Sequence, residues 1–208
     1  MRTRIKICGI TRVDDGLAAA RHGADAIGLV FYERSPRAVS IEQARALVAA
    51  LPPFDIAVGL FGNPTSALVG NVLMQVPPAL LPFPVSGTAE QCERYQRPYL
   101  KAVRMRFDTD LEKIATHYRS AQGLLLDTFR AGSYGGTGET FEWNQIPATR
   151  PKPIVLAGGL RPENIEEAVR RVRPEAVDVS GGVEAAKGVK DEALIAAFIR
   201  GVHHAERS

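Results

Sequence analysis

The sequence has few cysteines, no long apolar run and no concentrated charge, and each absence excludes a class of protein. Of its 208 residues only Cys8 and Cys92 are cysteines, so a disulfide framework and a cysteine-rich metal site are not expected. No segment approaches the roughly 18 apolar residues of a membrane helix, and no apolar signal region opens the chain. The net charge is +3 and the arginines are scattered, which argues against a nucleic-acid stripe. We therefore expect a reduced, cytoplasmic protein that binds neither membrane nor nucleic acid.

The composition is that of an ordinary globular protein. Hydrophobic residues make up 45% of the chain and charged residues 24%, both near the averages for soluble domains. A chain of this length has enough material for one core, and we expect a single domain over residues 1–208. The slight excess of positive charge suits a small anionic substrate.

Short apolar runs recur along the whole chain and alternate with helical patterns. Their length and richness in Val, Ile and Leu are typical of strands that are buried on both faces. Strands that alternate with helices indicate a parallel sheet with right-handed crossovers, an α/β fold. Eight units in one small domain favour a closed (β/α)8 TIM barrel over an open doubly wound sheet. The runs are Ile5–Ile10, Ala24–Phe31, Asp55–Phe61, Ala79–Phe83, Tyr99–Met105, Gly123–Thr128, Pro153–Gly159 and Ala176–Gly182.

Several helices are marked by start signals. Ser40 with Gln43 forms a capping-box pattern, and Thr88 is placed to cap the helix after the fourth run. Proline is placed early at two further starts, where its missing N–H costs nothing. These starts are Asn63-Pro64, with Pro64 at the first helical position, and 161–164. A last helix is expected from about Asp191 to His203.

Paired glycines follow the seventh and eighth runs. In a (β/α)8 barrel the active site lies at the carboxyl ends of the strands, and the last two loops commonly bind a phosphate. Gly158-Gly159 and Gly181-Gly182, the latter preceded by Ser180, would let backbone N–H groups approach an anion. Either pair alone would equally suit a tight turn. Their occurrence at both expected strand ends favours a phosphate site.

Three reactive side chains also stand at expected strand ends. Cys8, with Lys6 two positions earlier, is a base if nearby positive charge lowers its pKa, or else an inert core residue. Asp127 follows three leucines, which suits a general acid of raised pKa, although a cap or salt-bridge partner fits too. Arg37 offers a two-pronged bond to a carboxylate, or is a solvated surface residue. The long Gly-rich stretch 128–143 follows Asp127 and has the length of a functional loop.

Taken in order, these motifs resemble the phosphoribosylanthranilate isomerase family, the (β/α)8 enzymes of tryptophan biosynthesis. The similarity covers nearly the whole chain. The motifs that carry it are KICGIT, GADAIGLVFYERSPRAVS, AVGLFGN, LLLDT with GGTGETFEW, LAGGLRPENI, and VDVSGGVE followed by KGVKD.

The resemblance implies a cofactor-free Amadori rearrangement and a role for each matching residue. The substrate would be N-(5-phosphoribosyl)anthranilate, and the product 1-(2-carboxyphenylamino)-1-deoxyribulose 5-phosphate. Cys8 would be the general base at sugar C2, Asp127 the general acid at the ring oxygen, and Arg37 the ligand of the anthranilate carboxylate. The phosphate would lie at Gly159, Ser180, Gly181 and Gly182. The resemblance also implies a monomer that needs no metal.

Two stretches depart from the family's pattern. Where the family has Gln, an apolar residue and His-Gly-acid after strand four, this chain has Pro82 to Gly87, and prolines remove ladder donors from a central strand. We therefore expect a shortened or bent fourth strand. Gly181 replaces a second serine that the family often carries. Two alternatives to an active isomerase stay open: a non-catalytic phosphate-binding barrel derived from the family, and a related sugar-phosphate isomerase.

Overall fold

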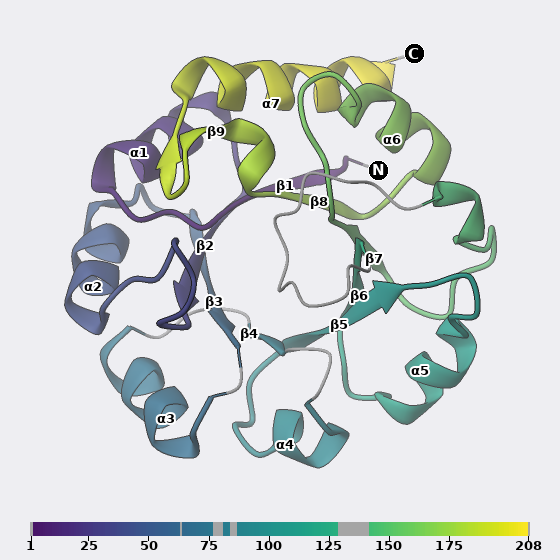
Figure 1. Cartoon of the computed structure of the whole chain (residues 1–208), viewed down its shortest axis with the longest axis horizontal. Coiled ribbons are helices and arrows are strands. Elements are labelled where there is room, and N and C mark those ends of the chain that lie inside the picture. Colours follow the sequence, from purple (N-terminus) through teal and green to yellow (C-terminus); the bar gives the residue numbers. More distant parts are fainter. Residues whose placement is uncertain (1, 63, 77–80, 84–86, 129–141, 208) are drawn as a thin grey trace.

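A computed structural model describes residues 2–62, 64–76, 81–83, 87–128 and 142–207 of the chain. Eight parallel strands form one sheet in the order β3-β2-β1-β8-β7-β6-β5-β4. Figure 1 shows this sheet curled into a ring with the helices around its outside, and β3 and β4 contact each other where the ring meets. The strands are β1 (Arg4–Cys8), β2 (Ala26–Phe31), β3 (Ile56–Phe61), β4 (Leu81–Phe83), β5 (Tyr99–Met105), β6 (Gly123–Thr128), β7 (Ile154–Leu156) and β8 (Ala176–Val179). The expected TIM barrel is confirmed.

The helices lie between the strands in sequence and pack on the outer face of the ring (Figure 1). They are α1 (Val13–His22), α2 (Ile41–Ala50), α3 (Ser66–Gln75), α4 (Ala89–Glu93), α5 (Leu111–His117), α6 (Ile165–Val172) and α7 (Glu192–Arg207). Two 3-10 turns, η1 (Trp143–Gln145) and η2 (Gly181–Val183), and a hairpin of β9 (Glu184–Ala186) and β10 (Val189–Lys190) complete the described elements. Within the described residues, no helix has the length and apolar character needed to cross a membrane.

Alternation along the strands separates an outer and an inner layer of side chains. On β6, Leu124 and Leu126 pack with Leu111 of α5, so they face outward. Leu125 lies between them and belongs to a separate cluster with Leu100 of β5 and Val155 of β7, so it faces the barrel interior. By the same alternation Asp127 faces inward, at the carboxyl end of β6.

The same rule places the inward side chains of β1 and β8. Ile5 and Ile7 belong to the large cluster that includes helix residues, so Lys6 and Cys8 face the interior. Lys6 lies in register with Asp178 of β8, and Cys8 with Gly28 of β2. The sequence pattern therefore brings charged and reactive groups to the inside of the barrel at one end.

Element boundaries differ from the sequence expectations where glycine or proline acts. β7 and β8 end before their glycine pairs, and Gly158 and Gly159 both have positive φ, which a strand does not allow. Pro64 does not begin α3, because Thr65 caps that helix and Ser66 is its first residue. The capping boxes at Ser40 and Thr88 are confirmed.

The fourth strand is described over Leu81–Phe83 alone, so the shortening expected from the prolines stays a prediction. β4 has three residues and pairs with β5, with Leu81 opposite Tyr99. Residues 79–80 and 84–86, which belong to the expected strand and to the departure from the family pattern, lie outside the described residues. Gly87, at the end of that stretch, is buried and its carbonyl accepts hydrogen bonds from Lys101 and Tyr118, each at 2.8 Å.

Candidate active site

Cys8 ends β1 with its thiol inside the barrel. The residue is 7% exposed. A Cβ added at Gly28 would lie 2.8 Å from Sγ of Cys8, so the thiol packs directly on the bare backbone of β2. Gly9, the next residue, has φ of 72° and turns the chain away from the strand. The local sequence therefore leaves the thiol at the rim of the interior.

A buried ion pair lies beside the thiol. Lys6 Nζ donates to Oδ2 of Asp178 over 2.7 Å, and both side chains are less than a tenth exposed. Oδ1 of Asp178 is buried and has no hydrogen-bond partner among the described residues. Lys6 precedes Cys8 by two positions, so both side chains leave β1 on the same face.

The surroundings of Cys8 act on its pKa in opposite directions. Burial raises the pKa of the thiol above its usual value, because the thiolate loses its water, and the Asp178 carboxylate raises it further. The ammonium groups of Lys6 and Lys190 lower the pKa again, although burial prevails. The thiol is therefore a strong base when ionised, held close to two cations.

Arg37 reaches the same end of the barrel from the loop after β2. A Cβ added at Gly9 would meet Cδ of Arg37 at 2.5 Å, so the arginine stem crosses the backbone next to Cys8. Its Nε and Nη2 atoms donate to the two carboxylate oxygens of Glu184, each over 2.7 Å. Lys190 Nζ, with its side chain fully buried, donates to Glu184 Oε1 over 2.9 Å. Among the described residues, Nη1 of Arg37 has no hydrogen-bond partner and remains available for an anion.

The glycine-containing loops after β7 and β8 contact each other next to this group of charges, where Lys190 Nζ donates to the carbonyl of Ser180. A Cβ added at Gly182 would lie 2.0 Å from the carbonyl oxygen of Leu160, so the loops after β7 and β8 touch backbone to backbone. Gly159 has φ of 66°, and its carbonyl accepts from Nδ2 of Asn164 over 3.0 Å. Ser180 Oγ lies 3.1 Å from the position of a Cβ at Gly9, which links this corner to β1. The structure thus brings together Gly159, Ser180, Gly181 and Gly182.

Asp127 lies near the end of β6, and the pairing of β6 with β5 shows which residue lies beside it. It is half-buried, faces inward and lies opposite Arg104 of β5. Cys8 and Asp127 therefore stand at carboxyl ends of strands of the same ring, with β7 and β8 between them. Of the expected loop 128–143, residues 129–141 lie outside the described residues. Trp143, the last residue of that loop, is partly buried against the main core.

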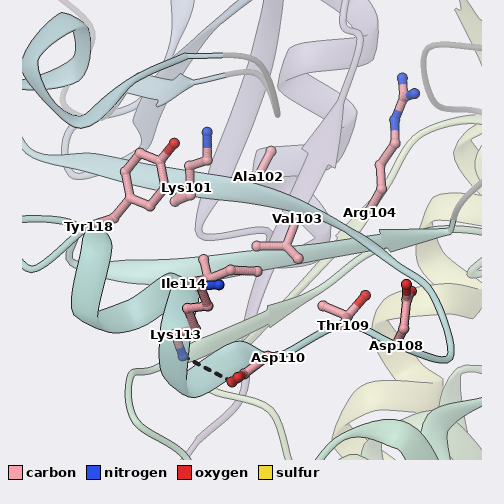
Figure 2. Close-up of a pocket in the computed structure, with 10 residues that line it drawn as sticks. All are labelled: Lys101, Ala102, Val103, Arg104, Asp108, Thr109, Asp110, Lys113, Ile114 and Tyr118. Carbon is pink, nitrogen blue, oxygen red and sulfur yellow. Dashed lines mark hydrogen bonds between the residues drawn. The ribbon is translucent and has the colours of Figure 1, made fainter.

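A hollow lies between β5 and α5, and Arg104, the residue opposite Asp127, is part of its lining. It has a volume of about 490 Å³, and Figure 2 shows Lys101 with Tyr118 at one end and Asp108 with Thr109 at the other. Burial lowers the pKa of Lys101 to about 8, and Nζ lies 4.2 Å from the centre of the Tyr118 ring. None of the candidate catalytic or phosphate residues lines this hollow. In the described part of the chain, no cluster of His, Cys, Asp and Glu could hold a metal ion.

Comparison with known proteins decides the family. The family model described as N-(5'phosphoribosyl)anthranilate (PRA) isomerase matches residues 5–201. The chain belongs to this family. It is 55% identical over 199 residues to the N-(5'-phosphoribosyl)anthranilate isomerase of Pseudomonas fluorescens strain Pf0-1, covering 96% of this chain and 98% of that protein. It is 56% identical over 204 residues to that of Pseudomonas aeruginosa strain UCBPP-PA14, covering 98% and 97%.

Solved structures of the family agree with the fold. The phosphoribosyl anthranilate isomerase of Thermotoga maritima superposes with a TM-score of 0.86 at 38% identity, covering 97% of this chain and 99% of that one. A structure of the isomerase in complex with reduced 1-(o-carboxyphenylamino)-1-deoxyribulose 5-phosphate has a TM-score of 0.82 at 36% identity, with the same coverage. The resemblance found in the motifs is confirmed.

The sequence reasoning missed four residues of this cluster. Asp178, Glu184 and Lys190 form its ion pairs, and Gly28 makes room for the thiol. Asp178 gave a signal, since it is a charged residue inside an otherwise apolar strand. Glu184 and Lys190 pair with each other across one hairpin, but the contact of Glu184 with Arg37 joins distant parts of the chain, and only the fold shows it.

Proposed function

We propose that the chain converts N-(5-phosphoribosyl)anthranilate into 1-(2-carboxyphenylamino)-1-deoxyribulose 5-phosphate, with Cys8 as base and Asp127 as acid. The isomerase activity and its place in tryptophan biosynthesis follow from the family. The assignment of residues rests chiefly on one observation. Arg37 lies across Gly9, beside the thiol, with Nη1 available for a carboxylate.

The reaction needs one proton donor and one proton acceptor. Asp127 gives its proton to the ring oxygen, the bond from that oxygen to C1 breaks, and the nitrogen lone pair forms the C1–N double bond. The resulting cationic Schiff base acidifies the C2 proton, which the Cys8 thiolate removes. The electron pair forms the C1–C2 double bond and neutralises the nitrogen. The enol then becomes the C2 ketone, as the C2 hydroxyl loses its proton and C1 gains one.

Anion contacts at the two ends of the substrate would fix this geometry. Arg37 would hold the anthranilate carboxylate through Nη1 while Glu184 keeps the guanidinium in place. The phosphate would lie on the backbone N–H groups of Gly159, Ser180, Gly181 and Gly182, where the two loops meet. Gly181 would still bind through its N–H, without the serine hydroxyl often found in the family.

Kinetics of two variants test the residue roles. Asp127→Asn keeps the shape but cannot donate the proton, so we expect kcat to fall about 10²–10⁴-fold with little change in KM. Arg37→Ala removes a carboxylate contact made throughout the reaction, so we expect mainly a higher KM. Near-normal turnover by Asp127→Asn would remove that residue from the mechanism.

We also propose that the protein acts as a single-domain monomer over residues 1–208, in the cytoplasm. One barrel with both anion sites in the same chain supports this proposal, since no second copy is needed to complete the site. The Thermotoga maritima enzyme has been described as dimeric. Light scattering after size-exclusion chromatography decides the assembly, and a mass twice that of the chain would contradict the monomer. Fractionation of the producing cells decides the compartment.

A further inference from the structure

The ion pair of Lys6 and Asp178 occupies a place that apolar side chains normally fill. Lys6 is 7% exposed and Asp178 8% exposed, inside the barrel. Burying two charges costs free energy of desolvation that their attraction often fails to recover, and well-packed apolar residues are commonly at least as stable. Stability alone therefore does not explain why β1 and β8 carry this pair.

The ion pair lies close enough to Cys8 to act on its thiol. Lys6 and Cys8 leave the same face of β1, with their Cα atoms about 7 Å apart at two residues' rise. A lysine side chain spans most of that length, and its ammonium group has three N–H donors, of which Asp178 takes one. Asp178 lies in register with Lys6 on the neighbouring strand, which fixes the direction of the ammonium group.

We propose that Lys6 is a positioning residue for Cys8: its ammonium group, held by Asp178, stabilises the thiolate that acts as base. The role in catalysis rests on the proposed function, whereas the effect on the thiol does not. Without Lys6, the buried thiol would remain protonated over a wider pH range and would accept the C2 proton less often.

Other charges face the thiol from neighbouring elements. Lys190 of β10 lowers the pKa of Cys8, while Asp178 of β8 raises it. Arg37, from the loop after β2, also interacts with the Cys8 charge. Glu184 of β9 accepts from both Arg37 and Lys190, whereas Lys6 leaves β1 on the same face as the thiol and lowers its pKa more than Lys190 does. Lys6 is therefore the cation whose removal changes the thiol most.

Titration of the thiol tests the proposal without substrate. The thiolate is followed by its ultraviolet absorbance against pH in the Cys92→Ala protein, with the signal of the Cys8→Ala/Cys92→Ala protein subtracted. In Lys6→Met we expect the pKa of Cys8 to rise by about one unit or more, the usual effect of losing a close opposite charge. The Lys101→Met protein, which also loses a buried lysine, is the control and keeps the pKa of the parent.

Two further measurements distinguish the proposed role of Lys6 from a simple loss of folding or of activity. Lys6→Met/Asp178→Asn leaves no charge unpaired in the interior, so it should fold and still show the raised thiol pKa. In Lys6→Met, kcat/KM should fall about tenfold at neutral pH and recover as the pH approaches the new pKa, which a merely structural defect would not do. An unchanged thiol pKa in both variants would overturn the proposal, even if the isomerase is active. Absence of activity with a raised pKa would instead contradict the proposed function.

Discussion

At the scale of single residues, two glycines make room for the reactive side chains of the site. Gly28 leaves space for the Cys8 thiol, and Gly9 leaves space for the stem of Arg37. These two glycines are adjacent in the fold, because the N–H of Gly9 donates to the carbonyl of Gly28 over 2.9 Å. A Cβ at Gly9 would also strain the backbone, since φ is 72° there, whereas a Cβ at Gly28 would act mainly on the thiol.

Gly28→Ala is expected to lower kcat while the protein stays folded. The added methyl group would lie 2.8 Å from Sγ, and the thiol must move to avoid it. A displacement of about 1 Å in a catalytic group is sufficient to cost about 100-fold in rate. The measurement is steady-state kinetics beside a thermal unfolding curve.

Gly70→Ala is the matched control, because a Cβ at Gly70 of α3 meets nothing within 4 Å. We expect unchanged kinetics and a slight gain in stability, since alanine is the better helix former. If Gly28→Ala turned over at the rate of the control, the packing of the thiol on β2 would not matter for its reactivity.

The sequence reveals single residues to different degrees. Cys8, Arg37 and Asp127 stand at strand ends within recognisable motifs, so their positions could be predicted. Asp178 and Glu184 could not be assigned partners, because each pairs with a residue more than a hundred positions away. Such pairs form only when the sheet closes, so a local sequence pattern cannot predict them.

At the scale of elements, β4 is the strand whose sequence is least suited to its place in the sheet, because it contains a proline. Proline at position 82 removes a backbone donor, and the described part of the strand pairs with β5 over Leu81–Phe83. Gly87, beyond this strand, is held by neighbouring elements, because Lys101 of β5 and Tyr118 after α5 both donate to its carbonyl.

The buried Lys101 predicts a pH dependence of stability. Its pKa is lowered by burial to about 8 in the folded protein, against about 10.4 in an unfolded chain. Between these values the unfolded state binds more protons, so the free energy of unfolding should rise with pH. We expect this rise in the native protein between about pH 8 and 10, and its loss in Lys101→Met.

Urea unfolding at several pH values measures this effect, with the difference between the two proteins cancelling the other titrating groups. Parallel curves for native protein and Lys101→Met would show that Lys101 stays protonated in the folded state. A stability difference that decreases with pH would contradict the direction of the shift.

Element boundaries could be predicted where a side chain defines them. The capping boxes at Ser40 and Thr88 are visible in the sequence and in the fold. The prediction that α3 starts at Pro64 is wrong, because Oγ1 of Thr65 accepts from the N–H of Leu68 and so caps the helix one residue later. Proline tolerates the first helical position, but a capping hydroxyl specifies the start.

At the scale of the whole molecule, the barrel was predictable because the apolar runs recur eight times with helices between them. Closure of the sheet then brings together residues that lie on different strands and loops. It places Lys6 beside Asp178 across β1 and β8, and brings the loops after β7 and β8 into contact at Gly182 and Leu160. The site is therefore a property of the ring, although its residues are scattered along the chain.

The central claim is that this ring carries an isomerase whose base is Cys8. The most direct test mixes the purified protein with freshly formed N-(5-phosphoribosyl)anthranilate and follows the loss of anthranilate fluorescence, with the Cys8→Ala protein in parallel. We expect rapid loss with the native protein and a rate lower by about 10²–10⁴-fold with Cys8→Ala. A folded native protein that binds a product analogue but leaves the fluorescence at its uncatalysed rate would contradict the claim and indicate a non-catalytic barrel.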